Sequence, residues 1–90
     1  MMHYVYIIYS LVFDKYYKGY TTQPLIRLEQ HNSGESRYTR SFIPWELVYL
    51  QSFSTKREAL KREKSLKKYG KSQLLALLAS PLNELDSFKS

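Results

Sequence analysis

Glu63 is the residue whose type and position most directly suggest chemistry. A helix predicted over residues 55–70 turns by about 100° per residue, which places Glu63 beside Ala59 and Leu66 in the apolar stripe of that helix. A carboxylate that faces a protein core needs a metal ion, a cation or several hydrogen-bond donors, because burial of an unpaired charge is costly. The sequence therefore predicts either a metal ligand or an internal salt bridge at this position.

Arg27 and His31 form a second candidate group. They are four residues apart in a predicted helix over residues 24–33, so they share one face of it. Together they could grip and polarise a phosphate, because the guanidinium offers a planar fork of donors. The alternative is ordinary polarity of a helix surface. Arg27, or Lys18 on a preceding strand, would also be the partner of Glu63 in an internal salt bridge.

Tyrosine is the third unusual feature, with nine in the chain and seven of them at or before Tyr38. Aromatic residues on strands usually pack. A phenol can also accept a proton where a nearby cation or metal lowers its pKa. Five tyrosines fall on a predicted hairpin of two strands and are open to either interpretation: Tyr4, Tyr6, Tyr16, Tyr17 and Tyr20.

The elements that must position these residues are short. Aromatic and β-branched runs predict strands, and capping residues with Pro24 and Gly34 predict helices. The predicted class is α/β (α+β), a small three-stranded, mostly antiparallel sheet flanked by helices. The order β-β-α-β-α-α corresponds to strands at 3–9, 15–20 and 45–53 and to helices at 24–33, 55–70 and 72–79.

Several local details follow from the same patterns. We expect a capping box at Thr55 and Glu58, a helix end at Gly70 and a cap at Ser72. Hydroxyls at Thr21 and Thr22 would cap the first helix. Residues 1–80 should form one domain, and residues 81–90 a polar tail tied down by Leu85 and Phe88. Strict alternation in the third strand puts one set on each side of the sheet: Leu47, Tyr49 and Gln51 against Glu46, Val48 and Leu50.

Charge is concentrated in one element. The net charge is +6, and the segment 56–71 carries all of it, with eight basic and two acidic residues. Such a stripe suits a polyanion, although a solvated helix face is the alternative.

The chain has no cysteine, its two histidines are far apart, and no glycine-rich phosphate loop is present. We expect a cytoplasmic protein, since no signal peptide or membrane span is evident.

Two short motifs connect these features. The segments Tyr4-Val5-Tyr6-Ile7-Ile8 and Tyr17-Lys18-Gly19-Tyr20-Thr21 resemble the half-motifs of the GIY-YIG endonuclease superfamily. Arg27, His31 and Glu63 match its catalytic Arg, its Tyr or His one turn later, and its metal-binding Glu. The resemblance extends through Leu78 and is greatest to small stand-alone bacterial members, with similarity also to the N-terminal nuclease domain of the excision-repair nuclease. Three positions depart from the pattern: Tyr4 replaces a glycine, Tyr20 replaces a lysine, and an asparagine after the metal Glu has no counterpart.

The resemblance implies a metal-dependent endonuclease that hydrolyses phosphodiester bonds. Glu63 would hold one Mg²⁺ or Mn²⁺, Arg27 would neutralise the transition state, and His31 would orient the water or phosphate. Either Tyr6 or Tyr17 would accept the proton of the attacking water. The expected nucleic-acid contacts, made to phosphates rather than bases, come from Lys18, Arg37, Arg40, Lys64, Lys67 and Lys68.

Other functions remain open at this point. A non-catalytic nucleic-acid-binding module would keep the fold and the basic stripe, and a nuclease subunit could need a protein partner for activity. A membrane-surface role is disfavoured, because the basic helix has few large apolar residues on its other face. We favour DNA over RNA as the substrate and a structure- or repair-related role. The sequence leaves branch or lesion specificity and oligomeric state open.

Overall fold

The three strands and the helices α1, α2 and α3 form from the segments whose patterns predicted them, while η1 and α4 form in segments predicted as a polar loop and a polar tail. The computed structural model describes residues 1–89. Its elements are β1 (His3–Ser10), β2 (Lys15–Thr21), α1 (Pro24–Asn32), the 3₁₀ helix η1 (Thr39–Phe42), β3 (Glu46–Phe53), α2 (Lys56–Leu66), α3 (Lys71–Leu78) and α4 (Leu85–Lys89). The sheet is antiparallel with strand order β2-β1-β3. The predicted class and the order β-β-α-β-α-α are confirmed.

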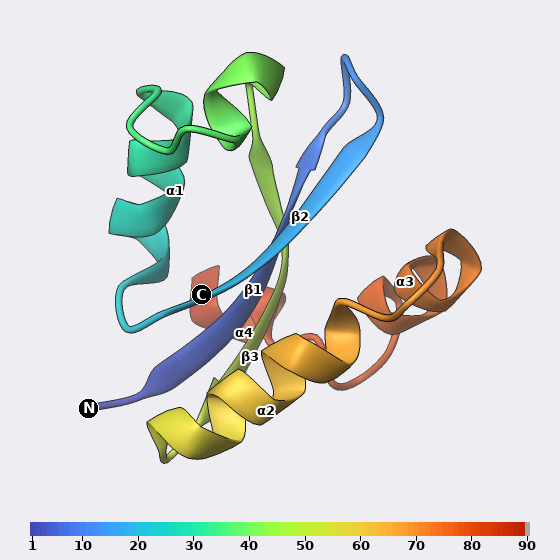
Figure 1. Ribbon diagram of the computed structural model, residues 1–90. Coiled ribbons are helices and arrows are strands. Elements are labelled where there is room, and N and C mark those ends of the chain that lie inside the picture. The colour runs from blue at the N-terminus through green and yellow to red at the C-terminus, as the bar shows by residue number, and fades with distance from the viewer. Residues whose placement is uncertain (90) are drawn as a thin grey trace.

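β1 is the central strand, as apolar residues on both of its faces predict. Val5 and Ile7 belong to the cluster on the α2 side of the sheet, and Tyr6 and Ile8 to the cluster on the α1 side (Figure 1). All four are at most 3% exposed. Burial of each such side chain contributes roughly 1.5–3 kcal/mol. The sheet is therefore held from both faces, and α1 and α2 lie on opposite sides of it.

β3 departs from strict alternation. Ile7 pairs with Tyr49 but Ile8 pairs with Leu47, so Val48 is an extra residue in the ladder. Such a bulge rotates the side chains that precede it relative to those that follow. Leu47 therefore packs on the α1 side, while Tyr49 and Val48 pack on the α2 side. The prediction that Leu47 shares a face with Tyr49, opposite Val48, is wrong for this reason.

α1 begins and ends close to the predicted positions. Pro24 occupies the first turn, and the helix is followed by Gly34 in the left-handed region, at φ +83°. The cap differs from the prediction. Gln23 is the N-cap and its side chain makes no capping bond, while the Thr21 hydroxyl accepts from the Gln23 backbone N–H at 3.0 Å. The threonine thus orders the turn that enters the helix.

α2 starts as predicted and ends early. The Thr55 hydroxyl accepts from the backbone N–H of Glu58 at 3.2 Å, which confirms the N-cap. The second half of the predicted capping box differs, since Oε1 of Glu58 accepts from the Thr55 hydroxyl, at 2.9 Å. The helix ends at Leu66 rather than at Gly70. A tighter turn follows, in which the Tyr69 N–H donates to the Leu66 carbonyl at 3.0 Å.

Gly70 begins α3 rather than ending α2. It is the N-cap of α3, and its N–H donates to Oε1 of Gln73 at 2.8 Å. Ser72, predicted as the cap, lies inside the helix. Among residues 1–89, no helix combines the length and apolar character that crossing a membrane requires.

The C-terminal segment protects the outer edge of β3. The Leu50 N–H donates to Oδ1 of Asn83 at 3.2 Å, and the Glu84 N–H donates to the Leu50 carbonyl at 2.7 Å. Glu84 accepts from both the N–H and the hydroxyl of Ser52, at 3.0 and 2.6 Å. These bonds satisfy edge groups that could otherwise pair with another chain.

The predicted tie-downs of the tail hold it in place. Leu85 is buried in the α1-side cluster, and the Phe88 ring meets the Tyr4 ring edge-on at 5.8 Å between centroids. The stretch that carries them forms the short helix α4. Ser90, the last residue of the predicted tail, lies outside the described residues.

Candidate active site

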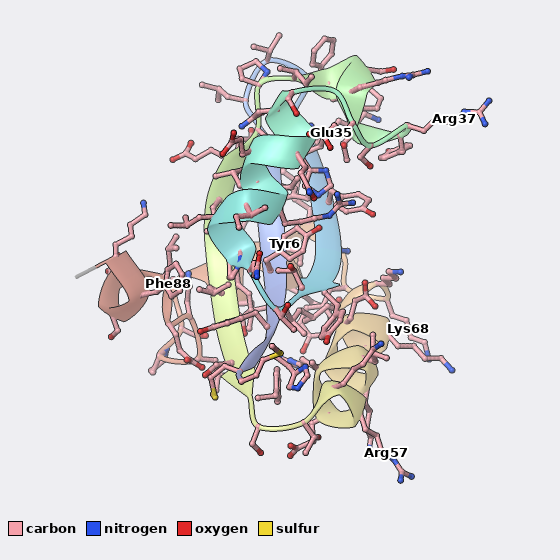
Figure 2. The ribbon with its side chains drawn as sticks, turned by 90° about the vertical axis from the view of Figure 1, so that its left-hand side faces the viewer. Tyr6, Glu35, Arg37, Arg57, Lys68 and Phe88 are labelled. Carbon is pink, nitrogen blue, oxygen red and sulfur yellow. The ribbon has the colours of Figure 1, made fainter. Side chains whose placement is uncertain are left out.

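Tyr6 lies across the sheet over a glycine. Tyr6 in β1 is paired with Gly19 in β2. A Cβ at position 19 would approach Cζ of Tyr6 to 2.5 Å and Cε2 to 2.7 Å, which real side chains do not tolerate. The glycine therefore leaves room for the Tyr6 ring on the α1 side of the sheet (Figure 2). This contact gives the two half-motifs a physical relation, since one supplies the ring and the other the space.

His31 joins Tyr6 to the η1 segment. Its ring is fully buried, with Nε2 2.8 Å from the Tyr6 hydroxyl and Nδ1 2.7 Å from Oγ1 of Thr39. Burial, and secondarily the charge of Arg27, lower the pKa of His31 to about 4. The imidazole is therefore neutral near pH 7, with one nitrogen donating and the other accepting. Both nitrogens are occupied by hydroxyl partners.

Burial also controls the acidity of Tyr6. Desolvation raises the pKa of Tyr6 to about 12, although the charge and hydrogen bonding of Arg27 act to lower it. The neighbouring Tyr17 and Glu63 raise it further. Arg27 therefore acts on Tyr6 in the expected direction, but the loss of hydration outweighs it. These influences also place Arg27, Tyr17 and Glu63 within electrostatic reach of the Tyr6 hydroxyl.

Tyr17 occupies a more open position beside the same histidine. Its ring is half-buried and meets the His31 ring edge-on, with centroids 5.2 Å apart. It also contacts Trp45 at 6.5 Å and Tyr38 at 6.0 Å. The two tyrosines of the half-motifs thus flank one imidazole, Tyr6 through a hydrogen bond and Tyr17 through its ring.

Glu63 lies where the helical wheel predicted. Ala59 and Leu66 on the same stripe are fully buried, and the Glu63 side chain is only 19% exposed. Neither Arg27 nor Lys18 forms an ion pair with it among the described residues. Its ion-pair partner there is Lys67, one turn on, with Nζ 3.7 Å from Oε2. Lys67 is 60% exposed, so this pair contributes little stability.

Arg27 completes the group from α1. Its side chain is partly exposed, and Nη1 donates to Oε1 of Gln30 at 3.0 Å. The structure thus brings Tyr6, Tyr17 and His31 into direct contact and places Arg27 and Glu63 where their charges act on Tyr6. The group draws on both faces of the sheet, since α1 and α2 lie on opposite sides of it and each supplies one of the two charged residues.

The predicted nucleic-acid contacts divide into two regions. Lys64 is exposed on α2, and Lys67 and Lys68 are exposed in the turn that follows it. Figure 2 shows Arg57 of α2 and Lys68 of that turn extending into solvent. Arg37 lies at the opposite end, between α1 and η1, with Arg40 exposed nearby. Lys18 on β2 is half-buried, and burial lowers its pKa. Cationic groups therefore lie on either side of the candidate site.

Thr39 is the functional residue that sequence reasoning missed. It is fully buried, holds His31 through its hydroxyl, and accepts at its carbonyl from Nε1 of Trp45 at 2.8 Å. Asn32 secures the same junction, accepting from the Trp45 N–H at 2.6 Å and donating to the Trp45 carbonyl at 2.9 Å. The segment 35–44 reads as a polar loop, and no periodicity in it marks Thr39 as buried.

The available donors suit a hard divalent ion with one protein ligand. Among residues 1–89, no three His, Cys, Asp or Glu side chains gather at one place, as a zinc or calcium cage would require. Glu63 offers a partly exposed carboxylate whose charge reaches Tyr6. Mg²⁺ is commonly bound through one or two carboxylates with waters and substrate phosphates, so this donor set fits Mg²⁺ or Mn²⁺.

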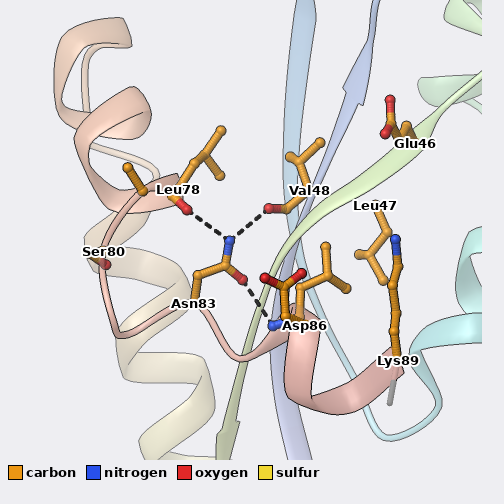
Figure 3. A pocket seen from close by; sticks show the side chains of 10 residues that line it. Glu46, Leu47, Val48, Leu78, Ser80, Asn83, Asp86 and Lys89 are labelled. Carbon is orange, nitrogen blue, oxygen red and sulfur yellow. Dashed lines mark hydrogen bonds between the residues drawn. The ribbon is translucent and has the colours of Figure 1, made fainter.

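A pocket lies away from the candidate active site. It has a volume of about 480 Å³ and is formed by β3 and the C-terminal segment (Figure 3). Asn83 lines it, but its amide already donates to the carbonyls of Val48 and Leu78 at 2.9 and 3.0 Å. None of the five candidate catalytic residues lines this pocket.

The fold and the residues at β2 are those of one family of nuclease domains. A model of the GIY-YIG catalytic domain matches residues 2–75, and the chain belongs to the GIY-YIG family. A UPF0213 protein of Haloquadratum walsbyi is 40% identical over 85 residues, covering 91% of this chain and 94% of that protein. A UPF0213 protein of Staphylococcus haemolyticus is 39% identical over 77 residues, covering 84% and 93%.

A solved structure agrees with this assignment. The solution NMR structure of the UPF0213 protein BH0048 from Bacillus halodurans is 36% identical to this chain, with a TM-score of 0.55. The match covers 90% of this chain and 89% of that one. The resemblance drawn from the half-motifs is therefore confirmed across nearly the whole fold.

Proposed function

We propose that the protein is a metal-dependent endonuclease that hydrolyses phosphodiester bonds in DNA, in a structure- or repair-related role in the cytoplasm. One observation carries the proposal. Glu63, turned inward from a strongly basic helix, lies within electrostatic reach of the Tyr6 hydroxyl, as Arg27 does from the other face of the sheet. An acid and a guanidinium whose charges act on one of two neighbouring phenols suit phosphodiester hydrolysis better than a structural ion pair.

Tyr17, rather than Tyr6, is the proton acceptor in this proposal. The Tyr6 hydroxyl is paired with His31, and a pKa of about 12 makes its phenolate costly near neutral pH. The ring of Tyr17 is half-buried and so remains accessible. It would accept the proton of the water that attacks phosphorus, while the leaving oxygen departs from the opposite side.

His31 is a positioning residue rather than a direct ligand of the phosphate. Its ring is fully buried and bonded at both nitrogens, so no surface remains to meet the water or the phosphate. It would hold Tyr6 and contact Tyr17, with Thr39 fixing its own orientation. This role replaces the direct contact expected from the sequence.

The remaining roles follow from charge. Glu63 would hold Mg²⁺ or Mn²⁺, and the bound ion would supply charge stabilisation at the scissile phosphate and the leaving oxygen. Arg27 would neutralise charge that develops on the phosphorane oxygens. Flanking phosphates would be held, without reading of bases, by the exposed Lys64, Lys67 and Lys68 together with Arg37 and Arg40.

A substrate panel tests the proposal. Purified protein is incubated with branched, flapped, duplex and single-stranded DNA and with RNA, each with Mg²⁺, Mn²⁺ or EDTA. We expect metal-dependent cleavage that is lost in Glu63→Ala and Arg27→Ala and kept in Glu29→Gln, which removes an exposed acid from α1. Salt-sensitive binding without cleavage under any metal would instead indicate a binding module. Cleavage that appears only with a second protein would indicate a partner-dependent subunit.

A further inference from the structure

A row of aromatic rings leads away from the candidate site, and only its first member, Tyr17, has a part in the hydrolytic roles above. It runs from Tyr17 to Tyr38, with centroids 6.0 Å apart, and on to Phe42 at 5.4 Å. Phe13, at the tip of the β1–β2 hairpin, meets Phe42 edge-on at 5.4 Å. We call these four side chains the aromatic ridge. It joins a proposed catalytic residue to the end of the hairpin.

Two rings of the ridge are open to solvent, while the other two, Tyr17 and Phe42, are half-buried against the α1-side cluster. Tyr38 is 56% exposed and Phe13 is 46% exposed, while the adjoining hairpin residues Leu11 and Val12 are 77% and 70% exposed. Contiguous exposed apolar side chains on a small protein mark an interaction surface. Tyr38 is the most exposed ring of the ridge, and it neighbours Tyr17.

Cations border the same surface. Lys15 places Nζ 5.6 Å from the centroid of the Phe42 ring, and the neighbours Arg37 and Arg40 are exposed on either side of Tyr38 in the sequence. Aromatic rings between cationic side chains are the arrangement with which proteins bind unpaired nucleotides, because bases stack on the rings and phosphates meet the cations.

The acidic side chains near the ridge, Asp14 and Glu35, already have partners within the chain. Asp14 at the hairpin forms an ion pair with Lys71 at 3.0 Å and accepts from the Tyr9 hydroxyl at 2.9 Å. Glu35, in the loop before η1, accepts from the Ser33 hydroxyl at 2.9 Å. Lys71 offsets the charge of Asp14, and the three bordering cations outnumber Glu35, which favours a polyanion over an apolar protein segment as the occupant of the ridge.

We propose that the aromatic ridge is a nucleobase-stacking subsite, with Tyr38 as its main platform, for an unpaired nucleotide beside the scissile phosphate. This inference rests on the proposed function and deepens it, since it assigns a strand with unpaired bases as the substrate class. Bases in a duplex are covered on both faces by their neighbours, so an unopened duplex cannot use the ridge.

Binding in EDTA tests the subsite without cleavage. Fluorescence anisotropy compares an oligothymidylate, a strand of equal length in which every base is absent, and a duplex. The wild-type chain should bind the thymidylate strand about 10-fold more tightly than the abasic strand. Tyr38→Ala should lose this preference by weakening thymidylate binding alone, while Tyr38→Trp and the remote control Leu75→Ala should keep it. Thermal denaturation verifies folding of each variant.

The outcomes of this experiment distinguish failure of the stacking subsite from failure of the proposed function. Equal weakening of all three ligands by Tyr38→Ala, or no weakening of any, would overturn the stacking subsite and leave the nuclease proposal intact. If Tyr38→Ala weakens the binding of no ligand, a protein partner becomes the next occupant of the ridge to test. Failure of the wild-type chain to bind any strand would overturn the subsite together with the nucleic-acid function.

Discussion

The two faces of the sheet contribute to the candidate site in different ways. On the α1 face, Tyr6, His31 and Thr39 form a buried chain of hydrogen bonds. On the α2 face, Glu63 is a single, partly exposed carboxylate among exposed lysines. The first arrangement fixes geometry and is tied to stability. The second supplies charge and costs the fold little, so substitutions on the two faces should have separable effects.

The largest expected effect on stability comes from the buried face. His31→Ala leaves a cavity and removes the partner of both the Tyr6 and the Thr39 hydroxyls. We expect a loss of about 3 kcal/mol in the free energy of unfolding, together with a loss of cleavage. Urea denaturation measures the first and the substrate panel the second. A variant as stable as the wild type would contradict the idea that this chain supports the fold.

Acid should lower the stability that the buried His31 side chain gives to the α1 face of the sheet. The pKa of His31 is about 4 when folded and about 6.5 when unfolded, so the unfolded chain binds a proton first. Stability should be complete above about pH 6.5 and fall by up to about 3 kcal/mol as the pH drops toward 4. Urea denaturation across this range measures the slope.

A matched variant assigns that slope to the buried imidazole. His31→Gln keeps a polar side chain but cannot titrate, so its stability should vary less between pH 6.5 and 4. His3→Gln, which replaces the other, half-buried histidine, serves as the control and should keep the slope. An unchanged slope in His31→Gln would assign the acid sensitivity to other groups.

A smaller loss is expected where the two half-motifs meet. The Cβ in Gly19→Ala would overlap the Tyr6 ring, and overpacking of this kind typically costs about 1–3 kcal/mol. The displaced phenol should also slow cleavage. Gly70→Ala is the control, because a Cβ there meets no atom nearer than 3.8 Å and φ is −81°. Equal stability of the two variants would refute the proposed contact.

The smallest effect is expected on the charged face. Lys67→Ala removes an exposed ion pair and should change stability by less than about 1 kcal/mol. If the lysine contacts a phosphate, the slope of log binding constant against log salt should fall by about 1. Binding titrations at several salt concentrations measure this. An unaltered slope would remove Lys67 from the nucleic-acid surface.

The sequence predicted what depends on local periodicity. The three strands, the central place of β1 and the inward turn of Glu63 all follow from alternation or from the helical wheel. Other features depend on contacts between distant segments and left no local pattern. The bulge at Val48 arises from pairing with β1, and the burial of Thr39 arises from η1 folding onto α1.

Chemistry was harder to predict than geometry for the same reason. The sequence suggested both phenols as bases, and only the burial of Tyr6 against His31 separates it from Tyr17. The sequence matched Glu63 and Arg27 to the family motif as two separate residues. Their common influence on the Tyr6 hydroxyl depends on the packing of α1 and α2 against opposite faces of the sheet.

The most direct test of the account is a paired measurement on Glu63→Gln. Single-turnover cleavage at saturating DNA and Mg²⁺ should fall by about 100-fold or more. The free energy of unfolding should stay within about 1 kcal/mol of the wild type, because the carboxylate contributes charge rather than packing. Cleavage that survives the substitution at wild-type rate would show that Glu63 holds no catalytic metal, and the proposed mechanism would be wrong.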